Sequence, residues 1–177
     1  DLAGTSPQVR GAINSTYSYT CGSAWTAVRA ILPQDIPNCD GSSRPIKVIA
    51  PEGSIANVIM PGACAARALT GFRMTDATFG ALAQMVPDRT MAASDGGNTN
   101  VSIGGYYRDR KPFIYVDFAC GAWGARSFGD GHDGLSHIKG NMASHPVEVI
   151  EAEYPIQFLA YEFVKDRSGP GKYRGGT

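Results

Sequence analysis

Apolar residues recur with helical spacing in two stretches of the 177-residue chain, residues 21–32 and 74–85. In both they fall three and four positions apart, which is the period of one face of an α-helix. We therefore expect two amphipathic helices, the first ending at Pro33 and the second at Pro87. Trp25 lies on the apolar face of the first and is predicted to belong to the core. Small residues predict that another element packs closely against the second: Ala77, Gly80, Ala81 and Ala83.

Runs of β-branched and aromatic residues predict strands over 101–103 and 113–119, and a hairpin is their simplest pairing because only a short polar segment separates them. Further strands are predicted over 46–50 and 156–164, and a short helix is expected after Pro146. Helices and strands do not alternate regularly enough for a doubly wound parallel sheet. We predict an α+β fold with a mixed sheet and at least two amphipathic helices, part of a larger domain.

Charge and cysteine content exclude several classes of protein. The 16 lysines and arginines equal the 16 aspartates and glutamates, so no overall field attracts nucleic acid or an anionic membrane. No apolar run is long enough to span a bilayer. Four widely spaced cysteines, without a C-x-x-C pair, are interpreted as free and mostly buried thiols in a reducing compartment. They are Cys21, Cys39, Cys64 and Cys120. These features predict a cytoplasmic protein that binds neither nucleic acid nor membranes.

One stretch concentrates the ionisable chemistry of the chain, and we call Cys120–Tyr154 the glycine-rich segment. It contains all three histidines, His132, His137 and His145, among closely spaced glycines and acidic residues. It follows the apolar run 113–119 and is predicted to be a long loop leaving the end of a strand. Loops on a rigid scaffold commonly carry function, although a tight surface turn would have a similar composition.

Individual motifs in this segment leave the chemistry open. Gly129–Gly134 matches G-x-G-x-x-G, but no strand runs into it and no clear helix follows, so a dinucleotide site is not predicted. His132, Asp133 and His137 could converge on a divalent metal, or be solvated loop residues. Arg67 and Arg126 could clamp a carboxylate or a phosphate, or pair with aspartates. Asn98 could position a substrate through its amide, or belong to a turn.

Several segments resemble, in order and spacing, the B-type subunit of the hydantoinase, 5-oxoprolinase and acetone or acetophenone carboxylase family. The resemblance covers essentially the whole chain. The segments are Gly4-Thr5-Ser6-Pro7-Gln8, Arg44-Pro45-Ile46, Ala50-Pro51-Glu52-Gly53, Gly80-Ala81-Leu82-Ala83-Gln84, Gly124-Ala125-Arg126, Asp130-Gly131, Asp133-Gly134, Pro146-Val147-Glu148-Val149-Ile150-Glu151, Ala152-Glu153-Tyr154-Pro155 and Tyr173-Arg174-Gly175-Gly176.

The resemblance implies a subunit that completes the active site of an enzyme whose A-type partner binds ATP with Mg. Such enzymes either open a cyclic amide or carboxylate a ketone. Residues 1–177 would be a single fragment of the middle to later part of a hydantoinase-B-type domain, inactive alone and assembled with the rest of the B-type subunit. A divalent metal, where present, would be held upstream of Asp1, so no metal ligand is assigned in this chain.

The resemblance also makes the glycine-rich segment one wall of a pocket for a small-molecule substrate. Catalytic roles are predicted for Asp130, Asp133 and His137. Substrate-binding roles are predicted for Arg67, Asn98, Trp123, Arg126 and Asn141. The predicted reaction is ATP-dependent hydrolysis of a cyclic amide of the hydantoin or 5-oxoproline type. The alternatives are ATP-dependent, biotin-independent carboxylation of a ketone, which the apolar surface of Trp123 would suit, and a non-catalytic scaffold subunit.

Overall fold

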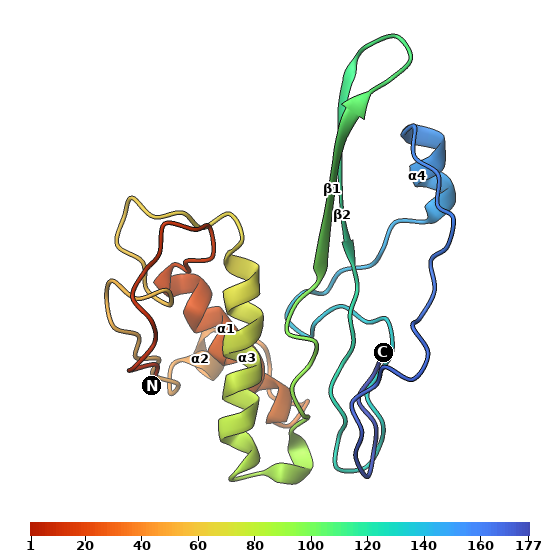
Figure 1. Ribbon diagram of the computed structural model, residues 1–177. Helices are drawn as coiled ribbons and strands as arrows, with labels where there is room; N and C mark the ends of the chain where they lie inside the picture. The colour runs from red at the N-terminus through yellow and green to blue at the C-terminus, as the bar shows by residue number, and fades with distance from the viewer.

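Two long helices and one hairpin organise the chain, which the computed structural model describes from residue 1 to residue 177 (Figure 1). In chain order the elements are α1 (Tyr17–Ile31), α2 (Asp40–Ser43), α3 (Arg67–Ala83), the 3-10 turn η1 (Pro87–Arg89), β1 (Thr99–Tyr106), β2 (Pro112–Ala119) and α4 (Val147–Glu153). The predicted α+β class is confirmed, and its regular sheet consists of two antiparallel strands.

Both predicted long helices are present. Thr16 caps α1, since its side chain accepts a hydrogen bond from the backbone N–H of Tyr19, and the helix ends as Leu32 becomes extended before Pro33. The helix α3 begins at Arg67, seven residues before its predicted apolar stripe, and Ala66 at its N-cap offers no side-chain hydrogen bond. The short helix predicted after Pro146 is also confirmed, as α4.

The two long helices meet through small polar side chains. Ser23 on α1 and Thr75 on α3 are fully buried, and the Thr75 hydroxyl donates to the Ser23 carbonyl oxygen over 3.2 Å. The closest approach is at Gly71, where a Cβ would overlap the ring of Tyr19. The predicted close contact around Gly80 is wrong, because nothing lies within 4 Å of a Cβ built there.

An apolar cluster joins the helix pair to the later part of the chain. Ala27, Phe79 and Met91 are buried together, and several half-buried residues pack against them. These are Ile31, Leu82, Trp123 and Ile138. The core prediction for Trp25 is wrong: its side chain is 37% exposed and its indole N–H reaches the Ile46 carbonyl at 3.4 Å. The buried side of α1 runs through residues such as Ala27 that face α3.

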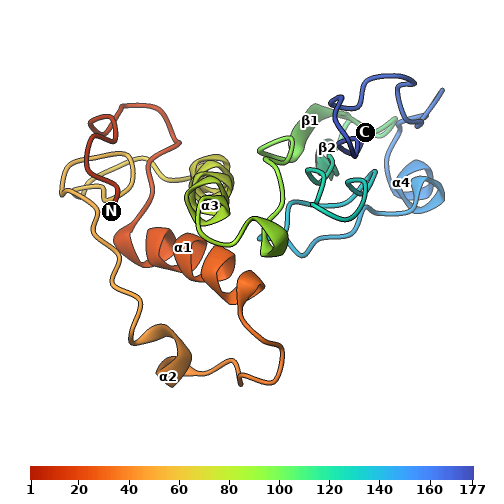
Figure 2. The same ribbon diagram turned by 90° about the horizontal axis from the view of Figure 1, so that it is seen from below.

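The predicted hairpin is confirmed and is longer than expected, with Thr99 opposite Ala119 and Tyr106 opposite Pro112. It stands beside the helix pair, and α4 lies on its other side (Figures 1 and 2). The strands predicted over 46–50 and 156–164 are not present. The second of these segments has no neighbouring strand and leaves Leu159 91% exposed, so its β propensity is not realised as a ladder.

The four cysteines are free, as predicted, but the expectation that most are buried is wrong. Only Cys21 is buried; Cys39 is exposed, and Cys64 and Cys120 are half-buried. None of the helices has both the length and the apolar character required to cross a membrane.

Candidate functional site

A cavity of about 1030 Å³ lies between the glycine-rich segment and the C-terminal part of the chain. One wall comes from the beginning and middle of the glycine-rich segment, and its predicted role in a substrate pocket stays a prediction. Its lining consists of Asp95, Ala119, Cys120, Gly121, Ala122, Gly134, Ser144, Tyr161, Glu162, Phe163, Val164, Arg167, Gly176 and Thr177.

Close backbone contacts hold this wall in place. The Trp123 N–H donates to the His132 carbonyl over 3.0 Å, and the Gly176 N–H donates to the Trp123 carbonyl over 2.9 Å. A Cβ at Gly131 or at Gly176 would overlap neighbouring backbone atoms. Glycine is therefore required where the glycine-rich segment passes residues 168–177, which we call the tail.

Asp95 brings an acidic group to the cavity. Its carboxylate packs against Gly121, where a Cβ would overlap it, and accepts a hydrogen bond from the Gly97 N–H over 3.3 Å. Asp95 is exposed on one side, and partial desolvation of its carboxyl group raises its pKa above the ordinary value; the hydrogen bond from Gly97 opposes that shift, and the nearby charge of Asp76 adds to it. A carboxyl group with a raised pKa beside a cavity is a candidate general acid or base.

Sequence reasoning missed Asp95, because Asp95-Gly96-Gly97 has the composition of an ordinary turn. Only the fold shows that the carboxyl group of this turn reaches a cavity formed with a distant segment.

Three polar side chains form a chain along the same cavity. The Cys120 sulfur lies 3.7 Å from the Ser144 hydroxyl, which lies 3.4 Å from the Tyr161 hydroxyl. Arg167, also exposed in the lining, adds one positive charge. The cavity thus offers hydrogen-bond donors and acceptors, together with positive and negative charges.

His137 is fully buried and is the centre of a second network. The Lys139 backbone N–H donates to His137 Nδ1 over 3.2 Å, so the proton of the neutral ring is on Nε2. That nitrogen lies 3.4 Å from Asp76 Oδ1, while Asp76 Oδ2 accepts from the Ser94 hydroxyl over 2.8 Å. Phe72 stacks on the imidazole at a centroid distance of 4.5 Å.

This network ties the turn at Ser94 and Asp95 to α3. Burial alone would raise the pKa of Asp76, but hydrogen bonds from His137 and Ser94 outweigh it and hold the pKa below its ordinary value. Both ring nitrogens of His137 have partners inside the protein. The geometry therefore favours a positioning role for His137 over direct proton transfer to a ligand.

Two predicted substrate-binding residues belong to the same buried network. The Asn98 amide donates to the Ser136 hydroxyl over 3.2 Å and accepts from the His137 N–H over 3.4 Å. The Trp123 indole N–H donates to the Ser136 carbonyl over 2.7 Å. Both side chains fix the backbone at residues 136 and 137 and do not line the cavity.

The two predicted catalytic aspartates bind the C-terminal tail. Asp133 makes a bidentate ion pair with Arg174, at 3.0 and 3.1 Å, and accepts from the Thr177 N–H over 2.7 Å. The Asp130 carboxylate accepts a hydrogen bond from the backbone N–H of Arg174 over 2.9 Å. The hydrogen bond from Arg174 and that from Thr177 lower the pKa of Asp133, so its carboxylate is ionised. Nearby Arg126 donates to the Asp130 carbonyl over 3.2 Å.

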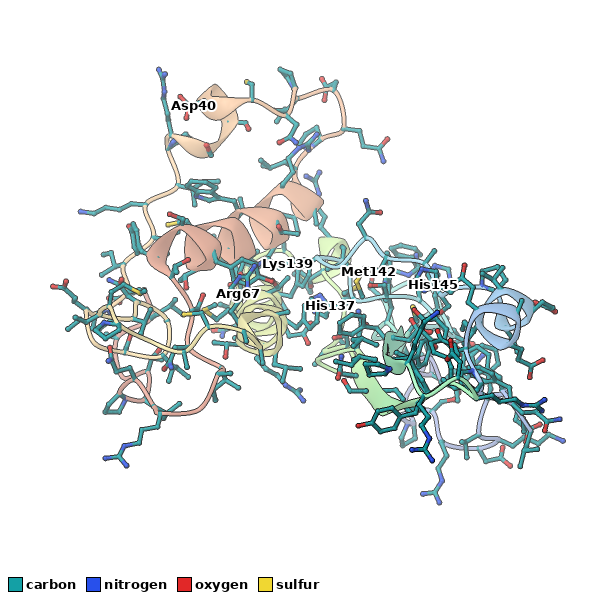
Figure 3. All side chains as sticks on the ribbon, turned by 90° about the horizontal axis from the view of Figure 1, so that it is seen from above. Asp40, Arg67, His137, Lys139, Met142 and His145 are labelled. Carbon is teal, nitrogen blue, oxygen red and sulfur yellow. The ribbon has the colours of Figure 1, made fainter.

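Arg67 and Asn141 lie apart from both groups. The Arg67 guanidinium is exposed, with its carbon 5.4 Å from the centre of the Tyr19 ring, while the Lys139 ammonium sits 3.2 Å from that centre (Figure 3). Burial, with a smaller contribution from the charge of Arg67, lowers the pKa of Lys139 to about 8. Asn141 is exposed with a φ of 46°, in the left-handed region. None of the eight predicted site residues lines the 1030 Å³ cavity.

The glycine run 129–134 does not form a phosphate site at a helix N-terminus, and the chain holds no cluster of three potential metal ligands. No three His, Cys, Asp or Glu side chains converge as metal ligands. The glycines of 129–134 do not open a helix, and Gly131 packs against backbone, so no set of helix N-terminal amides faces a phosphate there.

Comparison with known proteins adds sequence and fold relationships. The family model described as hydantoinase B/oxoprolinase matches residues 1–177. The chain is 36% identical over 183 residues to the B-type subunit of a putative D-/L-hydantoinase of Pseudomonas sp. (strain NS671), and this match covers 99% of the chain and 31% of the relative. The chain thus spans about a third of that protein.

Solved structures share its fold. The ATP-dependent caprolactamase of Pseudomonas jessenii superimposes with a TM-score of 0.86 at 23% identity, covering 99% of this chain and 31% of that one. A nucleotide-free acetone carboxylase gives a TM-score of 0.75 at 20% identity, covering 97% and 24%. At these identities the likeness concerns the fold alone.

Proposed function

This chain belongs to the hydantoinase B/oxoprolinase family, and on that basis we propose that it is part of the B-type catalytic subunit of an ATP-dependent enzyme that hydrolyses a cyclic amide of the hydantoin or 5-oxoproline type. The observation that carries this proposal is the 36% identity to the B-type subunit of a hydantoinase across 99% of the chain. The match covers only 31% of that relative, so the activity of the complete protein is a proposal and not a finding.

The 1030 Å³ cavity is the proposed substrate site, and Asp95 is its proposed acid–base group. When the C–N bond of a cyclic amide breaks, the nitrogen must gain a proton. A carboxyl group at the edge of a cavity whose pKa is raised by partial desolvation keeps a proton over a wider pH range and can deliver it. His137 and Asp76 position the turn that carries Asp95, through the hydrogen bond to Ser94.

ATP with Mg is proposed to bind an A-type partner subunit, and any further metal is proposed to have its ligands outside residues 1–177. No three potential metal ligands converge among the residues present, which supports a metal site elsewhere. Two relatives are named as single subunits, one of a hydantoinase and one of a caprolactamase, which supports a multi-subunit assembly. Four free cysteines support a reducing, cytoplasmic location.

The structure does not support the sequence argument for ketone carboxylation, which relied on the apolar surface of Trp123. Trp123 packs on the core cluster and hydrogen-bonds to Ser136, and it offers no surface to the cavity. Carboxylation and a scaffold role are therefore kept as alternative outcomes of the test.

The test measures ADP release by the complete complex of A-type and B-type subunits, supplied separately with hydantoin, 5-oxoproline, or acetone with bicarbonate. We expect ADP release coupled to ring opening with one of the two cyclic amides, and none with acetone. Acetone-dependent incorporation of bicarbonate would contradict the hydrolase assignment. Equal turnover by the A-type subunit with and without its B-type partner would identify a scaffold.

A further inference from the structure

A second, smaller cavity lies on one face of the hairpin. Strand alternation and register place Val101 opposite Asp117 and Ile103 opposite Tyr115 on the same face. That face looks toward α4 and the segment 156–161, which run beside the hairpin (Figure 1). Between them is a cavity of about 490 Å³, within the roughly 300–1000 Å³ of small-molecule pockets.

The walls of this cavity are mostly apolar and incompletely covered. Eleven of its 15 lining residues are hydrophobic, so the body of a ligand that fills it must be apolar too. Val101 and Ile103 remain 39% exposed although they face α4, whereas Ile150 of α4 is 3% exposed. A ligand that covered the two strand residues would remove apolar surface from water.

One end of the cavity carries a single fixed negative charge. Asp117 accepts from the Tyr115 hydroxyl over 2.6 Å and from the Phe118 N–H over 2.8 Å. Burial alone would raise its pKa, but these hydrogen bonds and the nearby His145 lower it, so the group is a carboxylate. Burial raises the pKa of Tyr115 to about 12, so its phenol keeps the proton that it donates.

The carboxylate of Asp117 has room for another donor. Its only other polar neighbour is His145, whose Nδ1 is 3.7 Å away, too far for a hydrogen bond, and whose side chain is 69% exposed. A carboxylate has about four lone-pair positions, and two are used by Tyr115 and Phe118. An N–H donor inside the cavity could occupy one of the remaining lone-pair positions.

We propose that this cavity binds a small molecule that joins an apolar ring or chain to an amine or amide N–H, and that Asp117 accepts the hydrogen bond of that nitrogen. The apolar body packs on Val101, Ile103 and Ile150. This site is distinct from the proposed substrate cavity, although Ala119, Ser144 and Tyr161 separate the two and line both. The proposal does not depend on the reaction assigned above.

Benzylamine is the probe, because it joins one aromatic ring to one ammonium group. Its binding to the full-length protein is measured by calorimetry and by NMR shifts, with benzyl alcohol as the uncharged comparison. We expect saturable binding of benzylamine and roughly tenfold or more weaker binding of benzyl alcohol, because its hydroxyl is a neutral donor and lacks the positive charge that strengthens the hydrogen bond of an ammonium to a carboxylate.

Two variants test the location. Asp117→Asn should weaken benzylamine binding roughly tenfold or more, and Ile103→Trp should abolish it by filling the cavity. Asp109→Asn, in the exposed turn of the hairpin where Asp109 pairs with Lys111, is the matched control and should bind as wild type does. If Asp117→Asn does not fold, Ile103→Trp and the benzyl alcohol comparison still decide the question.

The proposal is overturned if wild type shows no saturable binding, as it would if another segment of the polypeptide filled the cavity. It is also overturned if benzyl alcohol binds as tightly as benzylamine, or if folded Ile103→Trp binds benzylamine as wild type does.

Discussion

The helical region, residues 1–91, and the hairpin region, residues 92–177, are held together in different ways. In the first, α1 and α3 pack against each other through small side chains. Ser23, Thr75 and Ala27 are examples, and all three are fully buried. In the second, one two-stranded hairpin and a short helix leave apolar side chains such as Ile114 and Leu159 at the surface. The two cavities described above are lined by residues of the second region, the larger mainly by loops and the smaller by the hairpin, α4 and the segment 156–161.

On this basis we propose that the helical region is a scaffold and the hairpin region binds ligands. Loops carried by a rigid scaffold are suited to ligand binding because they can shape a cavity without disturbing a packed core. The two regions meet at His137, Trp123 and Lys139, which belong to the glycine-rich segment and pack against the helices. The glycine-rich segment therefore contacts the helices on one side and lines the cavity on the other.

Truncating the helical core should have the largest effect on stability. Phe79→Ala removes a ring that is 2% exposed and leaves a cavity, so the free energy of unfolding should fall by about 3–5 kcal/mol. Urea unfolding followed by circular dichroism measures it. Phe118→Ala, on the open face of the hairpin, is the control and should cost about 1 kcal/mol or less, because its side chain is 40% exposed. Equal losses would remove the distinction between the regions.

Breaking the junction should come next. His137→Ala leaves the buried Asp76 carboxylate with one donor fewer, and the free energy of unfolding should fall by about 2–4 kcal/mol in urea melts. His145→Ala removes an exposed imidazole and should change it by less than about 0.5 kcal/mol. A His137→Ala variant as stable as the wild type would show that the two regions do not depend on this contact.

Lys139 should give the junction a distinctive pH dependence. Its pKa is lowered to about 8 in the folded protein, so between pH 8 and about 10.5 the unfolded chain binds more protons and stability rises with pH. Because Lys139 is only half-buried, we expect a rise of about 1–2 kcal/mol, and Lys139→Met should lack it. Urea melts at pH 7, 8.5 and 10 measure the difference; parallel curves for the two proteins would rule out the effect.

Releasing the tail should have the smallest effect on global stability. Arg174→Gln removes the ion pairs to Asp130 and Asp133 but no core contact. We expect little change in the thermal midpoint and faster trypsin cleavage near Lys172, since the tail is held by polar contacts at the surface. Arg108→Gln, in the hairpin turn, is the control. Unchanged cleavage would mean that backbone contacts such as Gly176 N–H to Trp123 O suffice.

The sequence predicted elements whose signal is local. Helical spacing located α1 and α3, and two β-rich runs joined by a short polar segment located the hairpin. The runs 46–50 and 156–164 have the same composition but no partner strand, and pairing is a property of the fold that propensity does not encode. Trp25 was misplaced because the face of α1 that is buried depends on where α3 packs.

For the candidate site, the sequence pointed to the glycine-rich segment but not to the groups that face the cavity. The glycine-rich segment lines a cavity, while its role as the wall of a substrate pocket stays a prediction; within it, Asp133 pairs with Arg174 and His137 with Asp76. Partners this distant along the chain cannot be read from spacing. Asp95 went unnoticed because its turn composition says nothing about what lies opposite it.

The most direct measurement is the steady-state rate of the complete complex carrying Asp95→Asn, with its cyclic amide substrate and ATP. If the 1030 Å³ cavity is the substrate site, kcat should fall by about 100-fold or more, because an amide cannot exchange the proton. The thermal midpoint should stay near that of the wild type, and Asp88→Asn, an exposed aspartate of η1, should retain full activity. A wild-type kcat in Asp95→Asn would contradict the assignment of this cavity as the active site.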